Sequence, residues 1–121
     1  MSDPTLRKLL DSARSATSID PIEFAKCVWV TADDLARLAG LQGALVTVDF
    51  DSPRLQRYMR QSLAILSEAL NLNEDEALVL RWFREMPLPD FGMKTPETLV
   101  SEDQAESLLQ YVQSIASGSS G

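Results

Sequence analysis

Four times in this chain of 121 residues, a proline directly follows a residue whose short polar side chain can cap a helix. The four pairs are Asp3-Pro4, Asp20-Pro21, Ser52-Pro53 and Thr95-Pro96. Proline is favoured at the first helical position because its missing N–H is not needed there, and Asp, Ser or Thr before it accepts hydrogen bonds from the first turn. Each pair therefore predicts a helix start.

Apolar residues at three- and four-residue spacing extend these starts into amphipathic helices over about residues 4–16, 21–28, 53–70 and 96–100. Thr31 caps a further helix, which Gly40 ends.

Two capping boxes, in which a polar cap residue is followed three residues later by Glu or Gln, predict the remaining helices. Asn73 with Glu76 begins a helix that runs to about residue 85, and Ser101 with Gln104 begins one that Gly118 ends. We therefore expect an all-α bundle of about six or seven helices.

Residues 31–51 have the layout of a helix-turn-helix. Ala36 and Gly40 stand where that motif needs a small residue and a turn residue, and Val46 stands where its second helix needs an apolar contact. In residues 42–51, β-branched side chains alternate with others, which favours an extended segment, although packing against neighbouring helices could make the segment helical. We therefore predict a degenerate N-terminal helix-turn-helix.

The would-be recognition helix, residues 43–51, offers Thr47 but no Arg, Lys, Asn or Gln to read base edges. Arg54, Arg57 and Arg60 follow at three-residue steps and are the best remaining candidates for phosphate contacts. They are equally explained as a solvated face that pairs with nearby aspartates. We favour packing or dimerisation over DNA binding for this segment.

Charge is unevenly distributed along the chain. Residues 1–60 hold eight basic and eight acidic side chains, whereas residues 61–121 hold three basic and ten acidic ones, so the net charge of −7 lies entirely in the second half. This asymmetry is typical of a surface that faces a basic partner, and equally of a solvated acidic face. We divide the chain into N-terminal helices, 1–51, and a C-terminal helical domain, 52–121.

Several classes of protein are disfavoured by composition. The chain has no histidine, which is the commonest general base near neutral pH and a frequent zinc ligand. Its one cysteine, Cys27, lies in an apolar run and is expected in the core. We expect no catalytic site, metal or cofactor. We also expect a cytoplasmic protein, because the chain has neither a signal-peptide pattern nor an apolar run long enough for a bilayer.

The most distinctive stretch is residues 81–100, RWFREMPLPDFGMKTPETLV. It combines an aromatic helix end, a proline-bracketed loop with an apolar residue before glycine, and a Lys-Thr-Pro helix start. It resembles the C-terminal toxin-binding domain of the Xre/MbcA/ParS antitoxins, over about residues 52–118 and more weakly over 31–51. The resemblance implies a dimer that neutralises a toxin, often an NAD-consuming one with a RES fold, by presenting its last helix and tail to the toxin's active site.

The resemblance also implies roles for two sets of residues. Those that would shape the loop and the next helix start are Trp82, Phe83, Pro87, Phe91, Gly92, Lys94 and Thr95. Those that would contact the toxin are Glu102, Asp103, Glu106, Gln110, Tyr111, Ser114, Ser117 and Gly118. In such antitoxins the N-terminal helix-turn-helix commonly represses the operon, and this chain departs from the pattern in its recognition helix.

We therefore expect the antitoxin of a type II toxin–antitoxin system, which binds its cognate toxin directly and occludes the active site with an acidic last helix and tail. It would need no small-molecule substrate. The alternative is a dimeric transcriptional regulator that binds operator DNA. A small enzyme is a third possibility, which the missing histidine disfavours.

Overall fold

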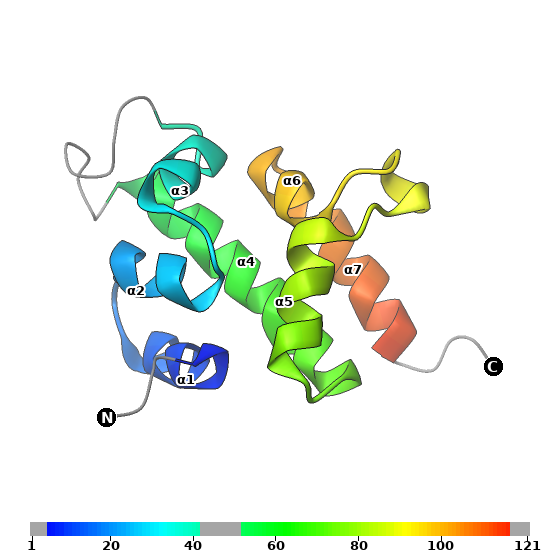
Figure 1. The fold of residues 1–121 in the computed structure, drawn as a ribbon, viewed down its shortest axis with the longest axis horizontal. Coiled ribbons are helices and arrows are strands. Elements are labelled where there is room, and N and C mark those ends of the chain that lie inside the picture. The colour runs from blue at the N-terminus through cyan, green and yellow to red at the C-terminus, as the bar shows by residue number, and fades with distance from the viewer. Residues whose placement is uncertain (1–4, 42–51, 117–121) are drawn as a thin grey trace. The chain divides into compact units, whose positions relative to one another are not determined.

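The computed structural model describes residues 5–41 and 52–116, and within these ranges every regular element is helical (Figure 1). The elements are α1 (Leu6–Ser15), α2 (Pro21–Cys27), α3 (Ala32–Leu38), α4 (Pro53–Leu72), α5 (Glu76–Glu85), the 3-10 helix η2 (Pro89–Phe91), α6 (Pro96–Ser101) and α7 (Ala105–Ala116). The predicted all-α bundle is thereby confirmed. Residues 42–51, which would hold the second helix of the helix-turn-helix, lie outside the described ranges.

The chain divides into two compact units, residues 1–60 and 61–121, here called unit 1 and unit 2. The division falls inside α4, whereas the domain boundary expected from the sequence precedes that helix. The long helix therefore contributes its first half to one unit and its second half to the other.

The core of unit 1 lies where α1, α2 and α3 pack against the start of α4. Leu6, Phe24, Leu35 and Leu55 are almost completely buried. The rings of Phe24 and Tyr58 meet edge to face with centroids 6.2 Å apart, an arrangement that aromatic pairs prefer. One apolar residue or more from each helix thus closes this small core.

The core of unit 2 is built from the second half of α4 and from α5, α6 and α7. Leu66, Phe83, Leu99 and Leu108 are fully buried. Helix α6 packs against both α5 and α7. The short α6 therefore connects the two longer helices on either side of it in sequence.

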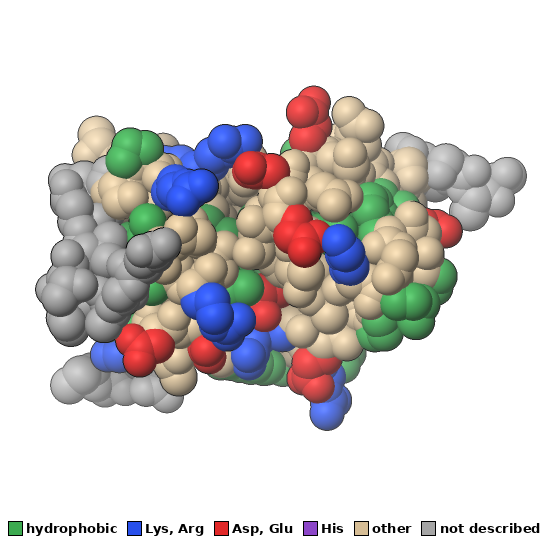
Figure 2. Space-filling model, turned by 90° about the horizontal axis from the view of Figure 1, so that it is seen from above, with side chains coloured by type: hydrophobic (Ala, Val, Ile, Leu, Met, Phe, Trp, Pro, Cys, Tyr) green, Lys and Arg blue, Asp and Glu red, His purple; other side chains and the backbone are tan. Residues whose placement is uncertain are grey.

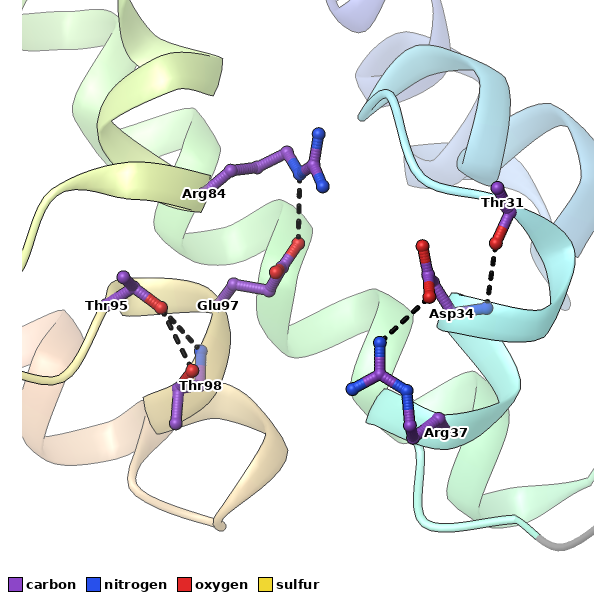
Figure 3. Close-up of polar contacts among 7 residues, drawn as sticks. All are labelled: Thr31, Asp34, Arg37, Arg84, Thr95, Glu97 and Thr98. Carbon is purple, nitrogen blue, oxygen red and sulfur yellow. Dashed lines mark hydrogen bonds and ion pairs between the residues drawn. The ribbon is translucent and has the colours of Figure 1, made fainter.

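Side-chain caps account for three of the predicted helix starts. Asp20 accepts a hydrogen bond from Ile22 N at 2.9 Å, Thr31 accepts one from Asp34 N at 3.0 Å, and Thr95 accepts one from Thr98 N at 3.2 Å (Figure 3). A proline stands at the first position of α2, α4 and α6, as expected.

Three predicted starts are wrong in detail. Helix α1 begins at Leu6, because the extended residue Thr5 accepts a hydrogen bond from Lys8 N at 3.2 Å and is the actual cap. Helix α5 begins at Glu76, because Asp75 caps it by accepting from Ala77 N at 3.0 Å. Asn73 instead accepts from Asp75 N at 2.9 Å, so it holds the cap residue and is not itself the cap.

The third error concerns the last helix. Ser101 is the final residue of α6 and does not cap α7. Asp103 adopts a left-handed φ of 65°, Asp103 N bonds Val100 O at 3.2 Å, and Gln104 N bonds Leu99 O at 2.8 Å. This is the Schellman closure of a helix C-terminus, and it delays the start of α7 to Ala105.

No helix in the described part of the chain has the length and apolar character required to cross a membrane.

Candidate functional site

Unit 2 carries most of the large apolar side chains that the described part of the chain exposes. Leu72, Leu78, Met86, Met93 and Ile115 are each exposed by between 46 and 59 %. Figure 2 shows hydrophobic side chains gathered on the surface of this unit, at the right of the view. Soluble proteins rarely leave large apolar patches in water, and those that they do leave often mark interaction sites.

Three of these exposed side chains, Leu72, Leu78 and Ile115, line a groove of about 200 Å3 in unit 2, which we call the Trp82 groove. It is lined by residues of α4, α5 and α7 and of the turn between α4 and α5, namely Ala69, Leu72, Asn73, Leu78, Val79, Trp82, Val112 and Ile115. Seven of these eight side chains are apolar or aromatic, so the groove offers little that would hold a polar substrate.

A second, shallower groove of about 340 Å3 lies along the C-terminal half of α5, and we call it the Met86 groove. It is lined by Leu78, Arg81, Trp82, Glu85, Met86 and Pro87. Leu78 and Trp82 line both grooves, and they stand four residues apart on α5. These two side chains therefore form a ridge with one groove on each side.

The sequence builds this surface by making two apolar stripes wider or longer than the core requires. On α5, Val79, Leu80 and Phe83 face the core, whereas Leu78 and Trp82 extend the apolar surface to a neighbouring face. On α7, Ile115 follows the buried Val112 at three-residue spacing and yet is 48 % exposed. Both helices thus carry apolar side chains beyond the core.

The loop after α5 has a defined backbone. Leu88 and Lys94 form an isolated antiparallel bridge, with Leu88 N bonded to Lys94 O at 3.0 Å and Met93 N bonded to Leu88 O at 2.9 Å. Gly92 and Met93 both adopt positive φ, 70° and 66°. The buried Leu88 anchors this hairpin, and the exposed Met93 lies beside the bridge residue Lys94.

Polar contacts hold the loop to the C-terminal end of α6 and hold α5 to α6. Lys94 Nζ donates to Glu102 Oε1 at 2.5 Å, and Arg84 Nε donates to Glu97 Oε2 at 3.4 Å, which ties α5 to α6 (Figure 3). Glu97 is only 15 % exposed, so this pair is better shielded from water than a surface ion pair. Two of the three basic side chains of unit 2 thus have carboxylate partners within the unit.

The residues expected to shape the loop take different positions. Phe83 is fully buried in the core, and Phe91 packs edge to face on Tyr111 with ring centroids 5.6 Å apart. Gly92 occupies a left-handed turn, Lys94 makes the ion pair and Thr95 caps α6. Trp82 and Pro87 do something else, since both line the surface grooves.

The residues expected to contact a toxin lie mainly along one exposed face. Glu106, Gln110 and Ser114 follow each other at four-residue spacing on α7 and are exposed. Tyr111 is half-buried, and its carbonyl oxygen accepts a hydrogen bond from Ser114 Oγ at 2.9 Å. Ser117 and Gly118 lie outside the described residues.

The acidic character expected of the last helix belongs largely to the preceding turn. Glu102, which pairs with Lys94, and Asp103, in its left-handed conformation, both precede α7. Helix α7 itself carries one acidic side chain, Glu106, and no basic one among its twelve residues. Its exposed face is therefore polar, with little charge.

Two of the three arginines considered for DNA contacts donate hydrogen bonds to backbone carbonyl groups within unit 1. Arg54 donates to Gly40 O at 2.9 Å, just beyond the end of α3. Arg60 donates to Thr17 O at 2.7 Å and Ala16 O at 3.5 Å, just beyond the end of α1. Cations at helix C-termini are favourable, so both guanidinium groups have a structural role. Arg57 is exposed on α4, and Thr47 lies outside the described residues.

Residues 5–41 and 52–116 contain no group of three or more acidic, Cys or His side chains arranged to hold a metal ion. Cys27 is buried, with its Sγ 3.6 Å from the carbonyl oxygen of Thr5. Its burial in an apolar setting is typical of a packing residue.

Sequence reasoning missed the part that Trp82 plays in the surface. A signal was present, because Leu78 and Trp82 share one face of the predicted helix while the four-residue pair Arg81 and Glu85 flanks them. An apolar pair set between charged residues indicates a stripe that reaches the surface.

Comparison of the chain with models of protein families, with curated proteins and with solved structures returns no significant match.

Proposed function

We propose that this protein is an antitoxin that neutralises a cognate protein toxin by binding it through unit 2 and occluding its active site. One observation carries the binding part of the proposal. Large apolar side chains that are nearly half exposed surround two connected grooves on one folded unit. Such a surface loses its contact with water when a partner covers it, which favours association.

The toxin part of the proposal rests on the resemblance of residues 81–100 to the toxin-binding domain of the Xre/MbcA/ParS antitoxins. The hairpin at Leu88–Lys94 and the capped start of α6 give this stretch a defined geometry. The exposed face of α7, with Glu106, Gln110 and Ser114, would enter the active site together with the residues that follow Ala116. The protein would act in the cytoplasm, as a dimer, without catalysing a reaction.

Co-expression with the protein encoded by the adjacent gene tests this function. We expect the full chain to restore growth to cells that the toxin arrests, and to co-purify with the toxin. A chain truncated after Ala116 should still co-purify and yet protect poorly, because the occluding segment is gone. Full protection by the truncated chain would contradict occlusion by the tail, and no co-purification by the full chain would contradict the antitoxin function.

A matched pair of surface variants tests whether the grooves carry the binding. Leu78→Ser alters the ridge shared by both grooves, whereas Ile22→Ser removes a side chain of similar exposure, 40 % against 49 %, from unit 1. We expect Leu78→Ser to weaken toxin binding at least tenfold and Ile22→Ser to leave it unchanged, because truncation of an interface anchor commonly costs that much. Equal effects would show that the grooves are not the interface.

Operator binding is less favoured, because two of the three candidate arginines, Arg54 and Arg60, hold helix ends and only Arg57 is left as an exposed candidate. A gel shift with the promoter upstream of the gene, at low and moderate salt, tests it directly. Strong binding that weakens steeply with salt would favour a transcriptional regulator over the function proposed above.

A further inference from the structure

We infer that the two grooves of unit 2 bind a basic amphipathic helix of a partner protein, which places one apolar side chain on each side of the Leu78–Trp82 ridge. The inference rests on the proposed partner-binding function and specifies the chemistry of the bound segment. It follows from the shape of the surface, its volume and its charge.

The shape favours a helix. Leu78 and Trp82 stand one helical turn apart on α5 and separate the two grooves. Helices pack by setting the ridge of one into the groove between side chains of another. A partner helix with apolar residues three or four positions apart can place one beside Val112 and Ile115 and the next beside Met86.

The size and lining of the deeper groove favour side chains over a small molecule. The Trp82 groove holds about 200 Å3, below the roughly 300–1,000 Å3 typical of small-molecule sites, and the shallower Met86 groove holds about 340 Å3, near the lower end of that range. Asn73 is the one polar residue that lines it, so a cofactor would find few groups to orient it. An apolar side chain needs no such groups.

The charge around the grooves favours a basic segment. Glu74, Asp75 and Glu76 directly follow Asn73 at one end of the Trp82 groove, and Glu85 lines the Met86 groove. Arg81 is the single cation in either lining and offsets Glu85, so the excess of carboxylates comes from the three acidic residues that follow Asn73. Lys or Arg side chains that flank the apolar anchors of a bound helix would therefore meet an excess of carboxylates.

The same features argue against two other occupants. Residues 117–121, Ser-Gly-Ser-Ser-Gly, bring no apolar side chain to fill the grooves. In a symmetric pair of identical chains joined here, the same patch would face itself and bring like charges together, and unit 2 has ten acidic against three basic side chains. A partner of opposite charge is favoured instead.

Binding of designed peptides to the full chain tests the inference. The probe is a helical peptide of about 15 residues with two leucines four positions apart and lysine on the flanking positions. One control peptide has glutamate in place of lysine, and another has serine in place of both leucines. The protein carries Trp29→Phe, so that Trp82 is its single tryptophan and its fluorescence reports on the groove.

We expect the lysine peptide to change the Trp82 emission and to bind at least tenfold more tightly than either control peptide. Leu78→Ser should weaken binding of the lysine peptide by at least tenfold. It alters the ridge and replaces no buried side chain, since Leu78 is 49 % exposed. Glu85→Lys should weaken binding of the lysine peptide and strengthen binding of the glutamate peptide. This substitution places a cation in the last turn of α5, which suits the helix dipole, so the fold should be preserved.

Three results would overturn the inference: no response of Trp82 to the lysine peptide, equal binding of the lysine and glutamate peptides, or concentration-dependent self-association that Leu78→Ser abolishes. The last result would make a second copy the occupant. The proposed antitoxin function can survive these results if the chain still neutralises its toxin. If the lysine peptide binds but the chain does not neutralise the toxin, the antitoxin function is rejected and the inference about the grooves stands.

Discussion

The side chain of Gln56 provides the most quantitative test of how unit 1 is held together. Its amide accepts a hydrogen bond from Ile19 N at 2.8 Å and donates one to Ile19 O at 2.9 Å. Ile19 is only 4 % exposed, so its backbone groups have little access to water. Gln56 thus anchors the segment between α1 and α2 to α4 through both polar groups of one buried residue.

Gln56→Ala should lower the free energy of unfolding by about 2–6 kcal/mol, because a buried donor or acceptor left without a partner costs about 1–3 kcal/mol and two are left here. For a chain of this length the melting temperature should fall by roughly 4 °C per kcal/mol. Urea unfolding, followed by circular dichroism, measures the free energy. A loss below about 0.5 kcal/mol would refute the reasoning, since water would then replace the amide at little cost.

Gln56→Glu separates the hydrogen bonds from the packing of the side chain. A carboxylate can accept from Ile19 N but repels Ile19 O, so the variant should be about as unstable as Gln56→Ala at pH 7. A protonated carboxyl can donate, which makes the neutral form favoured in the folded state and raises the pKa of the introduced group. Stability should therefore return as the pH falls toward the ordinary Glu pKa of about 4.3. Equal loss relative to the native chain at pH 4 and pH 7 would contradict this account.

Three further predictions concern single side chains. Ser62 is fully buried, and its hydroxyl has no hydrogen-bond partner in the described part of the chain, so Ser62→Ala should raise the free energy of unfolding by about 1–2 kcal/mol in urea titrations. Met93→Gly should raise the melting temperature by a few degrees, because φ is 66° there and a Cβ costs roughly 1 kcal/mol in that conformation. Hydrogen bonds from Arg37 and then Thr31 lower the pKa of Asp34, so its stabilising effect exists above about pH 4 and is lost below it. Asp34→Asn should therefore be less stable than the native chain by under about 1 kcal/mol at pH 7, and this difference should shrink as the pH falls below about 4.

Helix starts that depend on adjacent residues could be predicted from the sequence. Asp20-Pro21 and Thr95-Pro96 each combine a cap with a fixed φ, so the local chain decides the outcome without help from the rest of the fold. Asn73 shows where this logic fails. The sequence placed the cap at Asn73, but the carboxylate of Asp75 accepts the hydrogen bond from Ala77 N, while Asn73 accepts one from Asp75 N.

Helix ends were harder to predict because the usual glycine signal is missing from two of them. Gly40 has a φ of 76° and ends α3 where expected. Trp29 and Asp103 take the same left-handed role after α2 and α6, with φ of 63° and 65°. Val30 N bonds Ala25 O at 3.1 Å after the first of them, which is the same closure. Because side chains with a Cβ rarely adopt this conformation, the sequence favoured a capping box at Ser101 over a helix end at Asp103.

For the candidate surface, the sequence predicts which residues are apolar but not how far each one is exposed. Helical spacing indicates which apolar residues share one face of a helix. How many of them are buried depends on where the helix that packs against this face ends. Ile115 continues the stripe of Leu108 and Val112, and it reaches the surface because it lies one turn beyond the buried part of α7. On α5, Leu78 and Trp82 stand one turn apart beside the buried Val79 and Phe83, and Leu78 is 49 % exposed. In the function proposed above, a partner would complete the burial of these positions, so a substitution at position 78 should affect binding far more than folding.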